Sequence, residues 1–119
     1  MIYGKFKCEI YRVSIHVVYS ADIIEAEKAL RQKADFGYEG ITSDWQGGFI
    51  QNGSRFAMLL MPCKNLLRNV HHETLHITMS IFNRAGIPHT IETDEAFCYL
   101  SDWIFDKTVS FLRKKRITI

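Results

Sequence analysis

The chain has 119 residues, of which 47% are hydrophobic and 24% charged, and its formal net charge is +2. This length and composition fit one folded domain spanning residues 1–119 and exclude an intrinsically disordered chain. A charge so close to balance argues against a nucleic-acid-binding protein. No segment reaches the roughly 20 apolar residues of a membrane-spanning helix, so we expect no membrane partner.

The cysteines and the N-terminus bear on the cellular compartment. The chain has three scattered cysteines, an odd number with no C-x-x-C pair. That pattern is typical of free thiols in a reducing compartment. The first residues lack the basic, apolar and small-residue order of a signal peptide. We therefore expect a cytoplasmic protein.

Residues 6–19 are expected to form one or two strands. Apolar and polar residues alternate from Val13 to Tyr19, with a break or bulge near Ile10. His16 falls on the polar side of this alternation, so we expect it to be an exposed strand residue and not a metal ligand. Ser20 is then expected to cap a helix over about residues 21–33, which packs on the sheet.

The middle of the chain predicts a glycine-rich loop and a hairpin. Residues 34–48 contain four glycines and Trp45, a side chain that would plug the edge of a core. Asn52-Gly53, between strands at 49–51 and 55–61, is a dipeptide suited to a tight hairpin turn. After Arg55 the second strand is continuously apolar, which predicts that both of its faces are covered.

A helix is expected between Pro62 and Gly86, because proline is tolerated near a helix start and glycine is favoured just past its end. Its apolar residues step by three and four, as one buried stripe requires; they are Leu67, Val70, Thr74, Ile77 and Ile81. The same helix contains His72-Glu73-Thr74-Leu75-His76, an H-E-x-x-H motif. Its two histidines lie on a separate stripe with either Met79 or Ser80.

This spacing has a chemical rationale. Histidines four apart on a helix lie one above the other, so His72 and His76 can reach the same zinc ion. Glu73 can then take a proton from a water on that ion, because zinc lowers the pKa of such a water to about 7. The neighbouring His71 points about 100° away on the helix and is expected not to be a ligand.

A last helix is expected from about Asp94 to Lys115, with Thr93 as its cap. If this helix folds back antiparallel, Glu95 in its first turn is the third zinc ligand that we expect. Glu92, Asp94 and His89 remain alternatives to Glu95. Cys98 is a further soft ligand to consider, and Tyr99 could donate a hydrogen bond to an oxyanion or simply pack.

His72-Glu73-Thr74-Leu75-His76, followed by Asp94-Glu95-Ala96-Phe97-Cys98-Tyr99-Leu100, resembles the gluzincin branch of zinc metallopeptidases. Within that branch it is similar to the very small, often phage-associated minigluzincin-like proteins, over about residues 55–105. The resemblance implies an α+β, zincin-like fold: a small mixed or antiparallel sheet, about three helices, and an H-E-x-x-H helix packed on the C-terminal helix.

The same resemblance implies one zinc ion per chain on His72, His76 and Glu95, with Glu73 as general base. It also implies an edge strand that binds a peptide or protein substrate in extended form, for which Phe56–Leu60 is the candidate. The sequence departs from larger gluzincins at Tyr99, where those carry an aspartate.

Two hypotheses follow from these residues. The first is a zinc-dependent metallopeptidase or other amide hydrolase, with Glu73 and Tyr99 as catalytic residues. The second is a non-catalytic protein-binding module, in which the metal is structural or absent, since function belongs to the site and not to the fold.

Overall fold

The structure is a computed structural model that describes residues 1–34, 36 and 47–119. Most of the predicted loop at 34–48, including Trp45, lies outside the described residues. The elements in chain order are β1 (Ile2–Cys8), β2 (Val13–Tyr19), α1 (Ile23–Ala34), β3 (Gly47–Asn52), β4 (Arg55–Leu60), α2 (Leu66–Arg84) and α3 (Asp94–Lys114).

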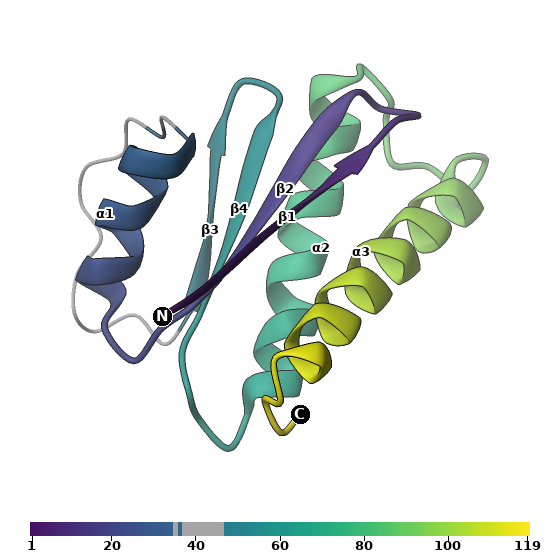
Figure 1. Cartoon of the computed structure of the whole chain (residues 1–119). Coiled ribbons are helices and arrows are strands. Elements are labelled where there is room, and N and C mark those ends of the chain that lie inside the picture. The colour runs from purple at the N-terminus through teal and green to yellow at the C-terminus, as the bar shows by residue number, and fades with distance from the viewer. Residues whose placement is uncertain (35, 37–46) are drawn as a thin grey trace.

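The four strands form one mixed sheet in the order β1-β2-β4-β3 (Figure 1). β1 and β2 are antiparallel, β2 and β4 are parallel, and β3 and β4 are antiparallel. The predicted α+β class with a small mixed sheet is confirmed. Phe56–Leu60, however, belongs to β4, which pairs on both sides. The prediction that this segment is an edge strand is therefore wrong, because the parallel crossover through α1 places β4 next to β2.

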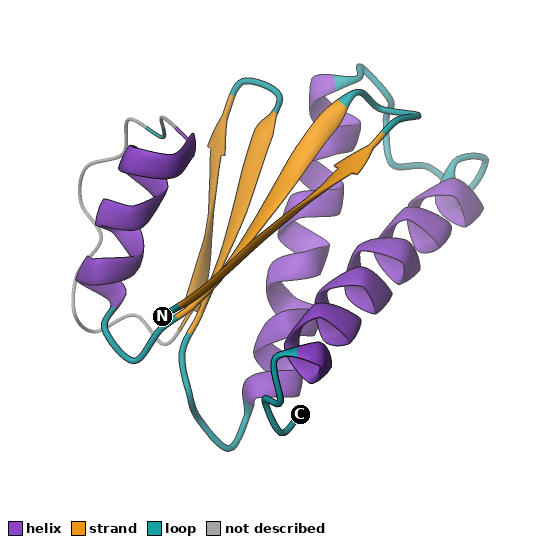
Figure 2. Ribbon diagram, viewed as in Figure 1, coloured by secondary structure: helices purple, strands orange, loops and turns teal. Residues whose placement is uncertain are grey.

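The helices lie on both faces of the sheet. Figure 2 shows α1 on one face and α2 and α3 on the other. Alternate residues of the central strands enter the two cores: Ile15 and Met58 pack on the side of α2 and α3, and Val18 and Leu59 pack on the side of α1. Because both faces are covered, every residue from Phe56 to Leu60 is buried, which confirms the prediction from its continuous apolar run.

The turns of the N-terminal half are partly as predicted. The expected break separates β1 from β2, and Arg12 there has a positive φ of 54°. Gly53 in the hairpin turn has a φ of 61°, a conformation that glycine adopts without strain. Ser20 does not cap α1. Asp22 does, because its Oδ1 accepts hydrogen bonds from the backbone N–H groups of Ile24 and Glu25.

His16 is buried, so the prediction that it is exposed is wrong. Its exposed fraction is 3%, and its ring lies edge-on to Phe36. Nδ1 is 2.5 Å from the Tyr3 hydroxyl oxygen, and Nε2 is 3.4 Å from Ser14 Oγ. Phe36 and α1 cover the face of the sheet that the alternation of β2 assigned to solvent.

α2 ends as predicted, since Gly86 follows it with a φ of 72°. Most of the predicted stripe is buried, including Val70, Ile77 and Ile81. Leu67 is 47% exposed, so its place in that stripe is wrong; Leu66 occupies the buried position at the start of the helix instead.

α3 begins at the predicted residue and ends one residue earlier than predicted. Thr93 stands at its N-cap position, but the side chain makes no cap hydrogen bond. Its hydroxyl instead donates to the Pro88 carbonyl oxygen and accepts from the Thr90 N–H group. Within the described residues, no helix is both long and apolar enough to cross a membrane.

Contacts along the two helices fix their register. Phe97 near the start of α3 meets Phe82 near the end of α2, with ring centroids 5.5 Å apart. Further down, Ser101 Oγ donates to Thr78 Oγ1 at 3.1 Å. α2 and α3 are therefore antiparallel neighbours, as the trace in Figure 1 also shows.

Candidate metal centre

His72 and His76 lie one turn apart on the exposed side of α2. Their Nε2 atoms are 3.2 Å apart, and their rings meet edge to face. Two nitrogens bound to one tetrahedral zinc at 2.0–2.1 Å would be separated by about 3.3 Å. The two imidazoles therefore already have the spacing of a shared ligand pair.

Glu73 belongs to the same group. One ligand atom from each of His72, Glu73 and His76 lies within 4.8 Å of the others, and this is the only such group of three or more His, Cys, Asp or Glu in the described part of the chain. Glu73 Oε1 is 3.7 Å from His72 Nε2. Its Oε2 is buried and has no hydrogen-bond partner among the described residues.

The position of Glu73 affects its protonation. Burial raises the pKa of its carboxyl group above the ordinary value, and the charge of His72 acts in the opposite direction. A buried carboxylate oxygen without a partner is costly unless a cation or a proton satisfies it. The two imidazoles and this carboxyl group together form a donor set that fits a divalent metal ion.

The sheet supplies the other wall of the site. The ring of Phe49 on β3 stacks on that of His76, with centroids 5.1 Å apart and an interplanar angle of 10°. Gly47, Gly48, Phe49, Glu73 and His76 line a shallow hollow of about 350 Å³. Among the strands that the structure describes, β3 is the outermost on this side of the sheet. The histidine pair therefore stands beside an edge strand.

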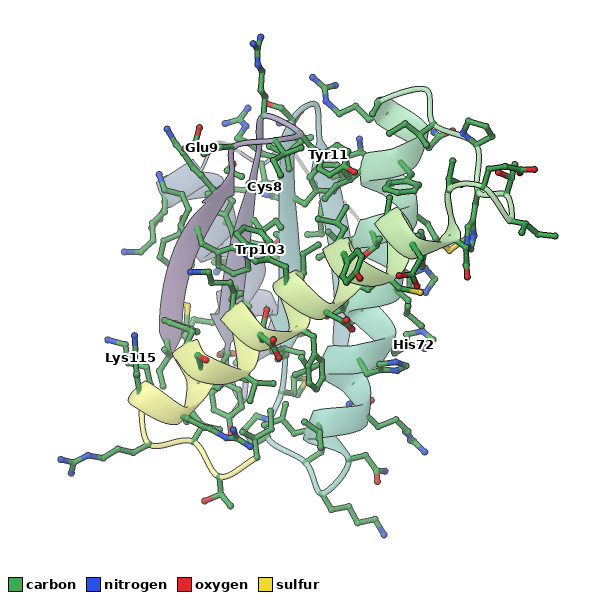
Figure 3. All side chains as sticks on the ribbon, turned by 90° about the vertical axis from the view of Figure 1, so that its right-hand side faces the viewer. Cys8, Glu9, Tyr11, His72, Trp103 and Lys115 are labelled. Atoms are coloured by element: carbon green, nitrogen blue, oxygen red, sulfur yellow. The ribbon has the colours of Figure 1, made fainter. Side chains whose placement is uncertain are left out.

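Glu95 is not brought into this group. Because Phe97 lies level with Phe82, Glu95 lies near the C-terminal end of α2, roughly 12 Å along the helix axis from His76 at 1.5 Å per residue. α3 also packs on the side of α2 that carries Thr78 and Phe82, whereas His76 faces β3. In Figure 3, His72 projects from α2 away from α3.

Tyr99 lies elsewhere again. Its side chain is 68% exposed and lines a groove with Cys8, Tyr11 and Trp103. That groove lies on the side of α3 that faces β1, so α3 separates Tyr99 from the histidine pair. The structure does not bring the predicted oxyanion donor to the candidate metal centre.

The alternative ligands form a separate set at the start of α3. His89 stacks on Phe97, and its Nε2 is 3.3 Å from Asp94 Oδ1. Hydrogen bonds from its own backbone and from the Thr90 side chain lower the pKa of Glu92, which is exposed. Cys98 is exposed on the same helix. None of these four residues joins the group around His76.

His71 is placed as expected for a residue that is not a ligand. It is exposed, and its ring lies edge-on to Phe105 of α3 with centroids 6.3 Å apart. His71 and His72 therefore face different sides of α2, which makes His71 a matched control for substitutions at the histidine pair.

Phe49 is the contributor that sequence reasoning missed. The hairpin pattern placed it on a strand, but a local pattern does not say which strand ends up beside the histidine helix. Had β3 been recognised as the edge strand, its alternation would have put Phe49 on the face that packs against α2. The alternation of β3 is visible in the sequence, but the strand order that is needed to interpret it is not.

Comparison of the chain with protein-family models, with curated proteins and with solved structures found no match. The resemblance to gluzincins therefore rests on the residues of the motif itself.

Proposed function

We propose that this protein is a zinc-dependent hydrolase of peptide or other amide bonds, with His72 and His76 as metal ligands and Glu73 as general base. The observation that carries the proposal is the 3.2 Å separation of the two Nε2 atoms, because it matches the separation of two nitrogens that share one tetrahedral ion. His and carboxylate donors make zinc the first choice of metal.

In this proposal the zinc ion, Glu73 and Phe49 have separate roles. A bound zinc ion would supply a water of lowered pKa and polarise the scissile carbonyl group. Glu73 would accept the proton of that water and pass it to the departing amine nitrogen, so the carboxylate returns to its starting state. The stacked ring of Phe49 would hold His76 in the orientation that the ion requires.

The site also favours an extended substrate. β3 is an edge strand, and the hollow beside it contains both Glu73 and His76. A peptide that pairs with an exposed strand is held by backbone hydrogen bonds along its length. The backbone of a peptide paired with β3 would then lie next to the histidine pair. β3 therefore replaces Phe56–Leu60 as the proposed substrate-binding strand.

One observation favours a second candidate, the non-catalytic binding module. The distance of 3.2 Å also suits a hydrogen bond between the two imidazoles, provided that one Nε2 is protonated and the other is not. In that case the histidine pair needs no ion, and Glu73 is simply a buried carboxyl group.

Metal content separates the two candidates. We expect about one zinc per chain in the purified protein by mass spectrometry. His72→Ala and His76→Ala should each lose it, and His71→Ala should retain it. A protein that takes up no zinc even when zinc is supplied would refute the metal site and leave the binding module.

Turnover is tested with a separate variant. Glu73→Gln should bind zinc as the wild type does and cleave a mixed peptide library at least a hundredfold more slowly, because the base is lost while the ligands remain. A Glu73→Gln protein as active as the wild type would disprove the mechanism. Zinc lost from Glu73→Gln would instead identify Glu73 as a ligand.

A further inference from the structure

The second edge of the sheet has its own surface feature. β1 pairs with β2 only, and across the described residues no backbone hydrogen bond occupies its outer side. Between β1 and α3 run two hollows of about 540 and 410 Å³, and Trp103 lines both. The two hollows share Trp103, which lies between β1 and α3 in Figure 3. They are here together called the β1–α3 groove, which is lined by Gly4 and Phe111 at one end and by Tyr11 and Ala96 at the other.

The two ends of this groove differ. At Gly4 the strand and helix touch, because a Cβ atom added there would collide with the Phe111 ring. Toward Tyr11 they diverge, and the wall becomes apolar and accessible: Tyr99 is 68% exposed and Ile10 86%. Trp103 forms the floor between them, with its ring edge-on to Phe6 at 5.5 Å. The groove is therefore an open surface along the outer edge of β1, and it is mainly apolar toward Tyr11.

The side chains of β1 define what could lie there. Phe6 and Cys8 face the core on the side of α3. Lys5 and Lys7 pair with His16 and Ser14 and so point to the opposite face, where both are exposed. A strand added beside β1 alternates in the same way, so its residues would meet Trp103 on one face and the two lysines on the other.

We propose that the β1–α3 groove binds an extended segment of another protein, in which apolar residues alternate with acidic residues, as a fifth strand beside β1. Apolar side chains of the segment would fill the groove, and its carboxylates would pair with Lys5 and Lys7. Lys107, 5.8 Å above the Trp103 ring, and Lys114 add positive charge along the α3 wall. Asp106 on that wall and Glu9 at the Tyr11 end are the opposing charges in the lining of the groove.

Two other readings are less consistent with these residues. Lysines on an edge strand also protect a sheet from aggregation, but that role needs no apolar groove beside the strand. A second copy of this chain would bring its own Lys5 and Lys7 against the same lysines, and like charges across a strand pair are destabilising.

The test uses the full chain and a defined probe. The probe is a fluorescent nine-residue peptide in which phenylalanine or leucine alternates with glutamate, and binding is followed by anisotropy. We expect the double variant Lys5→Glu/Lys7→Glu to bind at least tenfold more weakly, and Tyr99→Ala severalfold more weakly. Lys28→Glu on the exposed side of α1 is the matched charge control and should bind as the wild type does.

Two peptide variants test the mode of binding. Replacing glutamate by lysine in the probe should weaken binding at least tenfold. N-methylation of alternate amides should abolish binding for one set of residues and spare it for the other, because a strand pairs through every second residue. Binding should be the same in His76→Ala, which separates this proposal from the metal site.

Three results would overturn the proposal: no binding of the acidic peptide at millimolar concentration, equal binding of the acidic and basic peptides, or equal binding of both N-methylated sets. A homodimer in sedimentation analysis that Lys5→Glu/Lys7→Glu alters would also overturn it, because the occupant would then be a second copy.

Discussion

His16 and the pair His72 and His76 differ in burial and in what surrounds their ring nitrogens. His16 is enclosed between the sheet and Phe36, with the Tyr3 hydroxyl on one ring nitrogen and Ser14 near the other. His72 and His76 are exposed, and the nitrogen of each faces the nitrogen of the other. A histidine with both nitrogens occupied has no lone pair to offer a metal, whereas the Nε2 atoms of His72 and His76 converge at 3.2 Å.

The largest expected difference between the two groups is the response to zinc. A ligand that binds only the folded state stabilises it by about 4 kcal/mol when present at a thousand times its dissociation constant. We expect zinc to raise the melting temperature of the wild type, and EDTA to reverse this. The measurement is thermal unfolding with and without zinc.

The matched substitutions give the control. His76→Ala should show no stabilisation by zinc, whereas His16→Gln, although less stable in itself, should still respond. A zinc response that survives His76→Ala but is lost with His16→Gln would place the metal at the buried histidine and reverse the comparison.

Acid is expected to act on the buried histidine. Burial, followed by the charges of Lys5 and Arg55, lowers the pKa of His16 from 6.5 to about 4. The unfolded chain therefore takes up this proton near pH 6.5, and the folded chain only near pH 4. Stability conferred by neutral His16 is complete above pH 6.5 and is lost as the pH falls toward 4, by up to about 3 kcal/mol.

Urea unfolding between pH 7 and 4, in EDTA to remove any metal contribution, measures this slope. His16→Gln should be less stable at pH 7 and should lose less free energy than the wild type on going to pH 4. Equal losses in the two proteins would show that His16 does not titrate in this range and that other groups dominate acid unfolding.

The contrast also shows what the sequence could and could not predict. Helix periods and turn residues are local, so Gly53, Gly86 and the ends of α3 were predicted nearly to the residue. The burial of His16 was not, because the alternation of β2 does not show which face of the sheet α1 and Phe36 cover.

For the candidate metal site too, the local features were predicted and the long-range ones were not. The spacing of His72 and His76 was enough to place both imidazoles together, because one helical turn fixes it. Glu95 was assigned from an antiparallel helix pair, and that pair is present. The sequence did not reveal on which side of α2 the last helix packs, nor that β4 is interior and β3 forms the edge.

A smaller effect is expected at Tyr3. Its hydroxyl is the closest polar partner of His16, at 2.5 Å, and burial raises the pKa of this hydroxyl. Tyr3→Phe leaves a buried ring nitrogen without that partner, which we expect to cost about 1–2 kcal/mol in the free energy of unfolding. Tyr11→Phe is the control, because the Tyr11 hydroxyl makes no hydrogen bond within the described part of the chain. A cost no greater than that of the control would contradict the account of His16.

The smallest effect, and the most specific, is expected at Phe49. Its ring stacks on that of His76 but offers no ligand atom, so it orients one imidazole and donates nothing to an ion. Residues that orient metal-bound histidines typically change metal affinity by about 10–100-fold when replaced, usually through a hydrogen bond. A stacking contact is weaker, so Phe49→Ala should reduce zinc affinity about threefold to tenfold.

Phe49→Tyr keeps the stacked ring and should bind zinc as the wild type does. Competition with a zinc-binding dye measures both variants. If Phe49→Ala binds zinc as tightly as Phe49→Tyr, β3 does not orient His76, and the proposed link between the edge strand and the metal centre is lost.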